Sequence, residues 1–412
     1  YSELCEKISI PDRNKQHHPG IIMKSIYVPA NGQQFEGYWK NHPELEFNGY
    51  DIKYFTEKSA FQHDHALVNA YYNIDIENVR KTYGYPSNLK LLVDSGGFQI
   101  ASFTRKGKPI SIQPIDILRW IEKNADIGMN LDEPVVNDFD TSLKRSLENF
   151  QIFQNSRENY NFKLYNILHG HNLTQIKNWY NAVKEFDFDG WAIGIKPSSN
   201  VFLQTLGYMV LHENNAKNLL NNIHFFGMSS IQNMLALAML SHHFNTKITF
   251  DSSTFNMGSR TRMYYLPMSA RYFLLFGRNK QKLMKTLPCN CPYCRNTNID
   301  FMYSQDNQLV PIIISLHNLY QFVEVNKTIN ALVDDYDALL KYARSLNETK
   351  TVITMQNFLN DYNQHGYQKT YNDYKKSGIF IENFEQEKKK AETQKNINSY
   401  FPSKTENVYQ ML

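Results

Sequence analysis

The chain has few cysteines and no long apolar run, and each absence excludes a class of protein. Four cysteines among 412 residues are too few for the disulfide framework of a small secreted domain. No stretch approaches the roughly 20 apolar residues that span a bilayer. The amino terminus lacks the charged start, apolar run and small-residue cleavage site of a secretory leader. These absences predict a globular protein of a reducing, cytoplasmic compartment with no membrane partner.

A strong excess of charge of one sign is also missing. The net charge of +4 permits a basic face without requiring one, so nucleic-acid binding has to be argued from local features. With 42% hydrophobic residues, the chain can bury one large core, or a core plus an appended module. No internal repeat is visible.

Three of the four cysteines lie close together, at Cys289, Cys291 and Cys294, and His317 follows them. Thiolate and imidazole ligands in this C-x-C-x2-C…H spacing fit a closed tetrahedral Zn²⁺ site. Such a site leaves no coordination position for a reacting water, so the predicted zinc is structural. Disulfides among these residues are the alternative, and geometry disfavours bridges between such near neighbours.

Short apolar runs alternate with amphipathic stretches between residues 60 and 280. The strand-like runs are 90–94, 127–132, 163–168, 190–194, 223–227 and 247–251, and helix-like segments include 141–160, 173–186 and 230–242. Strands that alternate with helices favour a parallel sheet. The pattern predicts the α/β class, a (β/α)8 TIM-like barrel with an inserted C-terminal zinc-binding subdomain and a helical C-terminal extension.

The composition divides the chain into three parts. Residues 1–60 are polar and aromatic, with prolines that interrupt any helix, and are predicted to form an N-terminal cap or insertion. Residues 61–330 would form the barrel, with the zinc site at about 280–325. Residues 331–412 are predicted to be a helical extension that ends in a polar tail.

Polar residues follow several of these strands: Asp94, Asp132, His169 and Asp251. A barrel of this type builds its active site at the carboxyl ends of its strands. Each residue alone could be a helix cap or a loop carboxylate, whereas four at one rim favour a site. After Asp94, two glycines within Asp-Ser-Gly-Gly-Phe-Gln allow positive φ and let the backbone approach a flat ligand, unless the stretch is only a tight turn.

This strand end and the cysteine spacing together resemble the hallmark of the tRNA-guanine transglycosylase superfamily. Similar segments follow in the expected order over about residues 64–325, at 67–72, 126–133, 188–194, 250–251 and 317–319. The resemblance implies a glycosyltransferase, more specifically a pentosyltransferase, that exchanges guanine for a 7-deazaguanine. The exchange would pass through a covalent Asp-glycosyl intermediate.

The resemblance also implies roles for single residues. Asp251 would be the nucleophile, and Asp94 the general acid and base, which requires a pKa raised toward the working pH. Asp132 would accept hydrogen bonds from guanine N1–H and the amino group, between the rings of Phe98 and Phe226. Asn69 matches an asparagine that supports the nucleophile. Asn69 is also a base-binding candidate, and the further ones are Ser95, Gly96, Gly97, Gln99, His169 and Gly194.

Several positions depart from the pattern of the tRNA-acting members. The segment after Asp251 is longer and lacks their proline, although Arg260 and Arg262 could clamp phosphates, or else be ordinary surface arginines. His169 replaces a usual glutamine, and Lys196 a usual apolar residue. Lys196 would favour a 7-cyano over a cationic aminomethyl substituent, unless it points outward.

These departures favour the divergent DpdA-type branch, which places 7-deazaguanines such as 7-cyano-7-deazaguanine into DNA, with tRNA as the alternative polymer. The target base must leave its stack, so accessory DNA-opening proteins are candidate partners. The tail from Gln394 to Phe401 resembles a sliding-clamp docking peptide, or is a plain polar tail. The expected location is a nucleoid or another DNA-containing compartment. The competing hypotheses are a non-catalytic partner subunit and a hydrolase that removes a base without replacing it.

Overall fold

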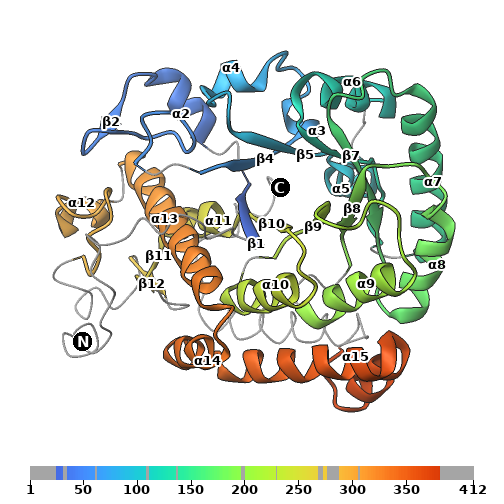
Figure 1. The fold of residues 1–412 in the computed structure, drawn as a ribbon. Helices are drawn as coiled ribbons and strands as arrows, with labels where there is room; N and C mark the ends of the chain where they lie inside the picture. The colour runs from blue at the N-terminus through green and yellow to red at the C-terminus, as the bar shows by residue number, and fades with distance from the viewer. Residues whose placement is uncertain are drawn as a thin grey trace.

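Eight parallel strands form a closed barrel at the centre of the molecule (Figure 1). The computed structural model describes residues 25–30, 35–60, 63–107, 111–135, 138–195, 200–228, 230–267, 272–275, 287–304 and 307–380. The strands are β1 (Ser25–Pro29), β4 (His65–Asn69), β5 (Lys90–Asp94), β6 (Ile127–Met129), β7 (Lys163–Leu168), β8 (Gly190–Ile193), β9 (Ile223–Phe225) and β10 (Ile248–Ser252). They pair in the order β1-β10-β9-β8-β7-β6-β5-β4. A bridge between Ala30 and Leu67 joins the two outer strands, which confirms the predicted barrel.

Helices surround the barrel in Figure 1. They are α3 (Ala70–Asn73), α4 (Val79–Tyr83), α5 (Gly97–Arg105), α6 (Pro114–Asn124), α7 (Phe139–Ser156), α8 (Leu173–Val183), α9 (Val201–Glu213), α10 (Ile231–His243), α11 (Thr254–Arg260) and α13 (Leu309–Leu332). Side-chain caps define where several of them begin: Asn172, Asn200 and Ser230 each accept a hydrogen bond from a backbone N–H of the following turn. The cap at Asn172 is the one expected from the sequence.

Smaller elements complete the described part of the chain. These are α2 (Glu36–Asn41), the hairpins β2 (Glu46–Phe47) with β3 (Tyr50–Asp51) and β11 (Met263–Tyr265) with β12 (Tyr272–Leu274), and α12 (Ile299–Tyr303). Strand β1 lies within the stretch 1–60 that was assigned to a cap, and it is an integral barrel strand. The three predicted domain boundaries stay predictions.

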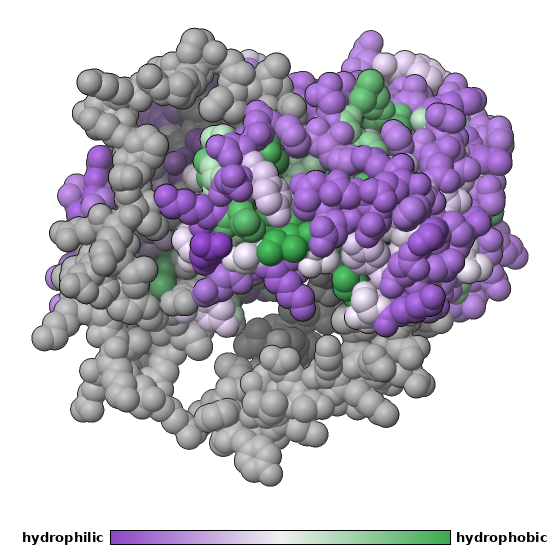
Figure 2. Space-filling model, turned by 60° about the horizontal axis from the view of Figure 1, so that its bottom comes forward, coloured by the Kyte–Doolittle hydropathy of each residue, from purple (hydrophilic) through white to green (hydrophobic). Residues whose placement is uncertain are grey.

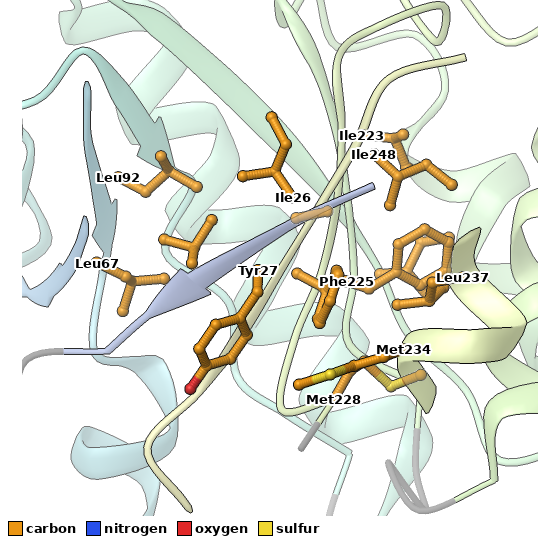
Figure 3. Close-up of a cluster of buried hydrophobic side chains, with 14 of the residues drawn as sticks. Ile26, Tyr27, Leu67, Leu92, Ile223, Phe225, Met228, Met234, Leu237 and Ile248 are labelled. Atoms are coloured by element: carbon orange, nitrogen blue, oxygen red, sulfur yellow. The ribbon is translucent and has the colours of Figure 1, made fainter. Parts of the chain in front are cut away.

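The apolar core lies on both sides of the barrel strands, because successive side chains of a strand face opposite sides. Figure 3 shows Leu67 and Leu92 gathered on one side of β1, and Phe225 with Leu237 on the other side, next to α10. All four side chains are buried. The surface in Figure 2 is mainly hydrophilic, with a small group of hydrophobic side chains near its centre.

The C-terminal extension packs on the outer ring of the barrel. Helices α14 (Tyr336–Ser345) and α15 (Thr349–Lys376) lie below α9 and α10 in Figure 1, and α15 contacts both. Every residue of α9 from Val201 to Leu211 is buried, so this helix has apolar surface on all sides and depends on that cover. Among the described helices, none combines the length and apolar character needed to cross a bilayer.

Candidate active site and metal centre

Strand register brings the predicted acidic residues to one end of the barrel. Asp94 is the last residue of β5 and pairs with Asn69, the last residue of β4. Asp251 is the fourth residue of β10, and Asp132 follows the end of β6 by three positions. Because all eight strands are parallel, their carboxyl ends open on the same rim.

The surroundings of Asp94 allow it to donate and accept a proton near neutral pH. Asn69 Nδ2 donates to its Oδ2 at 2.7 Å, and the Gly96 backbone N–H donates to its Oδ1 at 3.2 Å. Burial, reinforced by the charges of Asp132 and Asp251, raises the pKa of Asp94 to about 7 against the opposing effect of these two hydrogen bonds. The three carboxylates therefore lie close enough to interact electrostatically, and Asp94 is populated in both forms near neutral pH.

Asn69 supports a different carboxylate from the one that the resemblance assigned to it. Its amide nitrogen donates to Asp94 and also to Gln99 Oε1 at 3.1 Å, so neither hydrogen reaches Asp251. The sheet order explains the difference, because β4 lies beside β5, whereas β1 separates β4 from β10.

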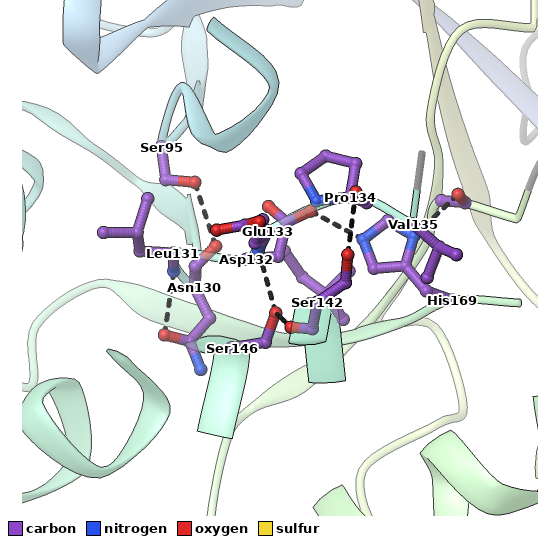
Figure 4. Close-up of polar contacts among 12 residues, drawn as sticks. Ser95, Asn130, Leu131, Asp132, Glu133, Pro134, Val135, Ser142, Ser146 and His169 are labelled. Atoms are coloured by element: carbon purple, nitrogen blue, oxygen red, sulfur yellow. Dashed lines mark hydrogen bonds and ion pairs between the residues drawn. The ribbon is translucent and has the colours of Figure 1, made fainter. Parts of the chain in front are cut away.

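The structure explains both glycines that follow Asp94: one has a positive φ, and the other packs too closely against a neighbouring loop to carry a Cβ. Gly96 has a φ of 88° at the start of α5, a conformation that residues with a Cβ rarely adopt. A Cβ on Gly97 would lie 2.0 Å from the backbone oxygen of Asp132. Ser95 Oγ donates to the Asn130 carbonyl at 3.0 Å (Figure 4). The turn after β5 is thus locked against the loop that carries Asp132.

Asp132 forms a short buried pair with His169 (Figure 4). His169 Nε2 lies 2.6 Å from Asp132 Oδ2, and Nδ1 lies 2.7 Å from the Gly194 carbonyl. A carbonyl only accepts, so Nδ1 carries a hydrogen, and a further proton must lie between Nε2 and the carboxylate. A Cβ on Gly194 would lie 2.5 Å from His169 Cε1. The pair therefore has a fixed geometry and a charge-assisted bond.

A second histidine, which is not among the predicted site residues, lies beside Asp251. His224 Nε2 is 3.3 Å from Asp251 Oδ1, and the Gly227 backbone N–H donates to the same oxygen at 2.9 Å. Among the described residues, both recorded hydrogen bonds fall on Oδ1, which leaves Oδ2 for a reacting atom. The available signal was spacing: His224 is two residues before Phe226, the predicted stacking ring that follows β9.

The two predicted stacking rings stand at the ends of different elements. Phe98 is in the first turn of α5, and its side chain is 51% exposed, so one ring face is accessible. Phe226 follows β9, and its ring is T-shaped to that of His224 at 5.0 Å. The sandwich of a base between the two rings stays a prediction.

The two predicted phosphate ligands differ in environment. Arg260 ends α11 and is exposed, whereas Arg262 is partly buried, has a φ of 57°, and has a pKa lowered by that burial. Arg260 is thus the better placed of the two to meet a phosphate. Lys196 and the segment from Gln394 to Phe401 lie outside the described residues.

The predicted metal ligands come together as the spacing indicated. One ligand atom from each of Cys289, Cys291, Cys294 and His317 lies within 4.8 Å of the others, and all four residues are buried. His317 Nε2 is 2.7 Å from the Tyr265 carbonyl, so Nε2 carries the hydrogen and the Nδ1 lone pair faces the thiols.

Neighbouring groups fix the orientation of this cluster. His317 Nδ1 lies 3.4 Å from Cys291 Sγ and 3.3 Å from Cys294 Sγ, while the Tyr264 ring stacks on the imidazole at 3.8 Å. A carbonyl that orients a metal-binding histidine is a usual feature of such sites. The donor set of three sulfurs and one nitrogen fits a closed four-coordinate metal.

A (β/α)8 barrel with an acidic rim and a closed Cys3His cluster defines the class of protein. The chain belongs to the queuine tRNA-ribosyltransferase (TGT) family, whose model matches residues 65–349, more than half of the chain. Members of this family are transglycosylases, so guanine transglycosylase activity is supported at the family level. A search of the curated proteins returned no match. Helix α15 begins where the family match ends.

Proposed function

We propose that this protein is an enzyme that exchanges guanine for a 7-deazaguanine base in DNA, through a covalent intermediate on Asp251. One observation carries the proposal: the three carboxylates of the rim have different protonation environments. Asp132 and Asp251 each face a histidine, whereas the recorded partners of Asp94 are an amide and a backbone N–H. Carboxylates whose environments separate their pKa values are suited to different roles in one reaction.

In the first half of the reaction, the Asp251 carboxylate attacks the sugar C1′. A bond forms between C1′ and a carboxylate oxygen while the C1′–N9 bond breaks, and the bonding electron pair leaves with guanine. Asp94, with a pKa of about 7, supplies the proton that the departing base takes up. The sugar is then held as an ester of Asp251.

In the second half, a 7-deazaguanine occupies the place of guanine. Its N9–H returns a proton to the Asp94 carboxylate, N9 attacks C1′, and the ester bond to Asp251 breaks. Both half-reactions therefore use the same two carboxyl groups, with no net consumption of protons. Asp132 would accept from N1–H and the amino group of either base, which explains how one pocket binds both.

The choice of DNA rests on the segment that follows the nucleophile. Residues 252–262 lack the proline of the tRNA-acting pattern, and their middle part is helix α11, which packs against α13 with Phe255 and Asn256 buried. This arrangement leaves Arg260 as the exposed cation of the segment. The second candidate is exchange in tRNA, which the name of the matched family favours.

We further propose that the Cys3His cluster holds zinc, bound by Cys289, Cys291, Cys294 and His317. Four protein ligands complete a tetrahedral shell, so the metal would brace the structure and take no part in the exchange. The chemistry is then left to the carboxylates of the barrel rim.

The test is base exchange with purified protein. Radiolabelled guanine is offered with plasmid DNA, with single-stranded DNA and with bulk tRNA, and the label in each polymer is counted. We expect label in DNA, with more in single strands if opening proteins are needed, because a stacked base cannot enter the pocket. Label in tRNA alone contradicts the choice of DNA, label in neither favours a non-catalytic subunit, and loss of guanine without uptake indicates a hydrolase.

A further inference from the structure

His224 is fully buried, and its ring nitrogens face two polar side chains of the neighbouring strand. Register explains this arrangement: His224 on β9 pairs with Thr249 on β10, and Thr249 and Asp251 share one face of β10 because they are two residues apart. The three side chains therefore form a row on a single face of the sheet.

The hydrogen bonds of this row determine where its protons lie. Thr249 Oγ1 donates its only hydrogen to the Ile223 carbonyl at 3.1 Å. With its hydrogen placed there, it accepts from His224 Nδ1, which lies 3.0 Å away. A neutral imidazole would then have no hydrogen on Nε2, and its lone pair would face Asp251 Oδ1 at 3.3 Å.

In that case a lone pair and a carboxylate oxygen face each other with no hydrogen between them. One additional proton removes this repulsion, and it can lie on Asp251 or on His224. On Asp251 it would remove the negative charge that attack on C1′ requires. On His224 it gives an imidazolium that donates at both nitrogens, and an adjacent positive charge stabilises an ionised carboxylate. Of these two placements, only the second also leaves a nucleophile. The competing arrangement turns the Thr249 hydroxyl toward Nδ1 and lets a neutral imidazole donate from Nε2 to Asp251. It gives up the bond from Thr249 to the Ile223 carbonyl.

We propose that His224 is a positioning residue that, as an imidazolium anchored by Thr249, keeps Asp251 ionised and holds its Oδ1 away from the substrate. The Gly227 N–H shares this task on the same oxygen, so Oδ2 is the atom directed at the sugar. The proposal rests on the assignment of Asp251 as the nucleophile.

Other titratable groups surround the pair. Asp94 on β5 interacts electrostatically with Asp251, as it does with Asp132, which His169 contacts. On β1, burial and then the charge of Asp251 raise the pKa of Tyr27 well above its usual value, so this phenol stays neutral. Asp94 is thus the neighbour whose titration overlaps the working pH.

The experiment measures the rate of covalent trapping against pH, in single turnovers with the polymer that takes up label. In His224→Gln the amide can still donate a hydrogen bond but carries no charge. The pH below which trapping fails should therefore rise by about one unit or more. Loss of trapping at high pH, which Asp94 sets near its pKa of about 7, should remain and serves as an internal reference.

Thr249 provides a matched pair of variants at a residue that does not touch the substrate. Thr249→Val removes the acceptor for Nδ1–H and should shift the acid limb in the same direction by less. Thr249→Ser keeps the hydroxyl and should retain the wild-type profile. This pair tests the proposal even if His224→Gln does not fold.

The possible outcomes separate the inference from the assignment beneath it. If Asp251→Asn still forms the adduct, the nucleophile is misassigned and the proposed function fails. If Asp251→Asn abolishes the adduct while folded His224→Gln and Thr249→Val keep the wild-type acid limb, only the role of His224 is overturned.

Discussion

Two histidine–aspartate pairs lie on the rim of the barrel. They differ in contact distance and in the group that holds the second ring nitrogen, and their proposed roles, base recognition and nucleophilic attack, differ as well. The Asp132–His169 pair has a contact of 2.6 Å, and a backbone carbonyl fixes the second ring nitrogen. The Asp251–His224 pair has a contact of 3.3 Å, and a threonine hydroxyl fixes the second nitrogen. The side chain of Asp251 is also more exposed than that of Asp132, 14% against 8%.

The difference teaches how one pocket can use several acids. A carboxylate that only recognises a base gains from a short bond and a rigid backbone partner. A carboxylate that forms and breaks an ester needs one oxygen held and the other accessible, which a longer contact on Oδ1 allows. Asp94 is the acid with no histidine among its recorded partners, and burial, with the charges of the other two carboxylates, raises its pKa to about 7.

The largest effect should come from Asp251→Asn, which breaks the looser pair without changing its shape. We expect exchange to fall by roughly 10³-fold or more, because the nucleophile is lost. Label uptake from guanine is the measurement, and circular dichroism with metal content is the control for folding. Exchange at the wild-type rate contradicts the assignment.

Asp94→Asn tests the acid that has no histidine partner against the two acids that have one. Loss of the general acid and base should lower exchange by roughly 10²–10⁴-fold. Because the folded-state pKa of Asp94 is raised to about 7, the wild type loses stability as pH rises from the unfolded-state value through 7. The variant should therefore be more stable by roughly 4 kcal/mol at pH 8, with little difference at pH 4.

Urea unfolding of both proteins at pH 4 and pH 8 measures this stability difference. A difference that is equal at the two pH values would mean that Asp94 does not titrate within the pocket.

His169→Gln should affect the tighter pair alone. The imidazole is replaced by an amide, and loss of the short bond to Asp132 should raise KM for the incoming base by about tenfold. The pH profile of trapping should change little, in contrast to His224→Gln. If His169→Gln moves the acid limb instead, the two pairs do not have separate roles.

Cys291→Ser should have the smallest effect on the rim. It removes one of four buried ligands, so metal content, solubility and melting temperature should fall. The protein that remains folded should keep the wild-type pH profile, because the cluster has no open position for substrate. Elemental analysis and thermal unfolding are the measurements, and a changed pH profile would connect the metal to the chemistry.

Much of the barrel could be predicted from the sequence, because its strands are short apolar runs separated by amphipathic helices. The six expected runs all contain strands of the barrel. Strands β1 and β4 were not among them, and β1 follows a polar, proline-interrupted stretch. Its place depends on pairing with β10, more than 200 residues away, which no local pattern reveals.

The metal cluster and the candidate site were predictable to different degrees. Spacing alone identified the three cysteines and His317, and the structure brings them together. The acids of the rim followed from the strand ends and the family resemblance. His224 was missed because a histidine within an apolar strand resembles a core residue, and its meaning depends on register with Thr249 and Asp251. The contact of Asn69 with Asp94 likewise depends on the register of β4 with β5.

The most direct measurement of the central claim is the site of the covalent adduct. The protein is incubated with its polymer, denatured in acid and digested, and the modified peptide is sequenced by mass spectrometry. The account predicts a base-free sugar phosphate on Asp251, with more adduct at pH 6 than at pH 8.5, because Asp94 must be protonated to release guanine. An adduct on Asp94 or on any other residue, or active exchange with no adduct, would contradict it.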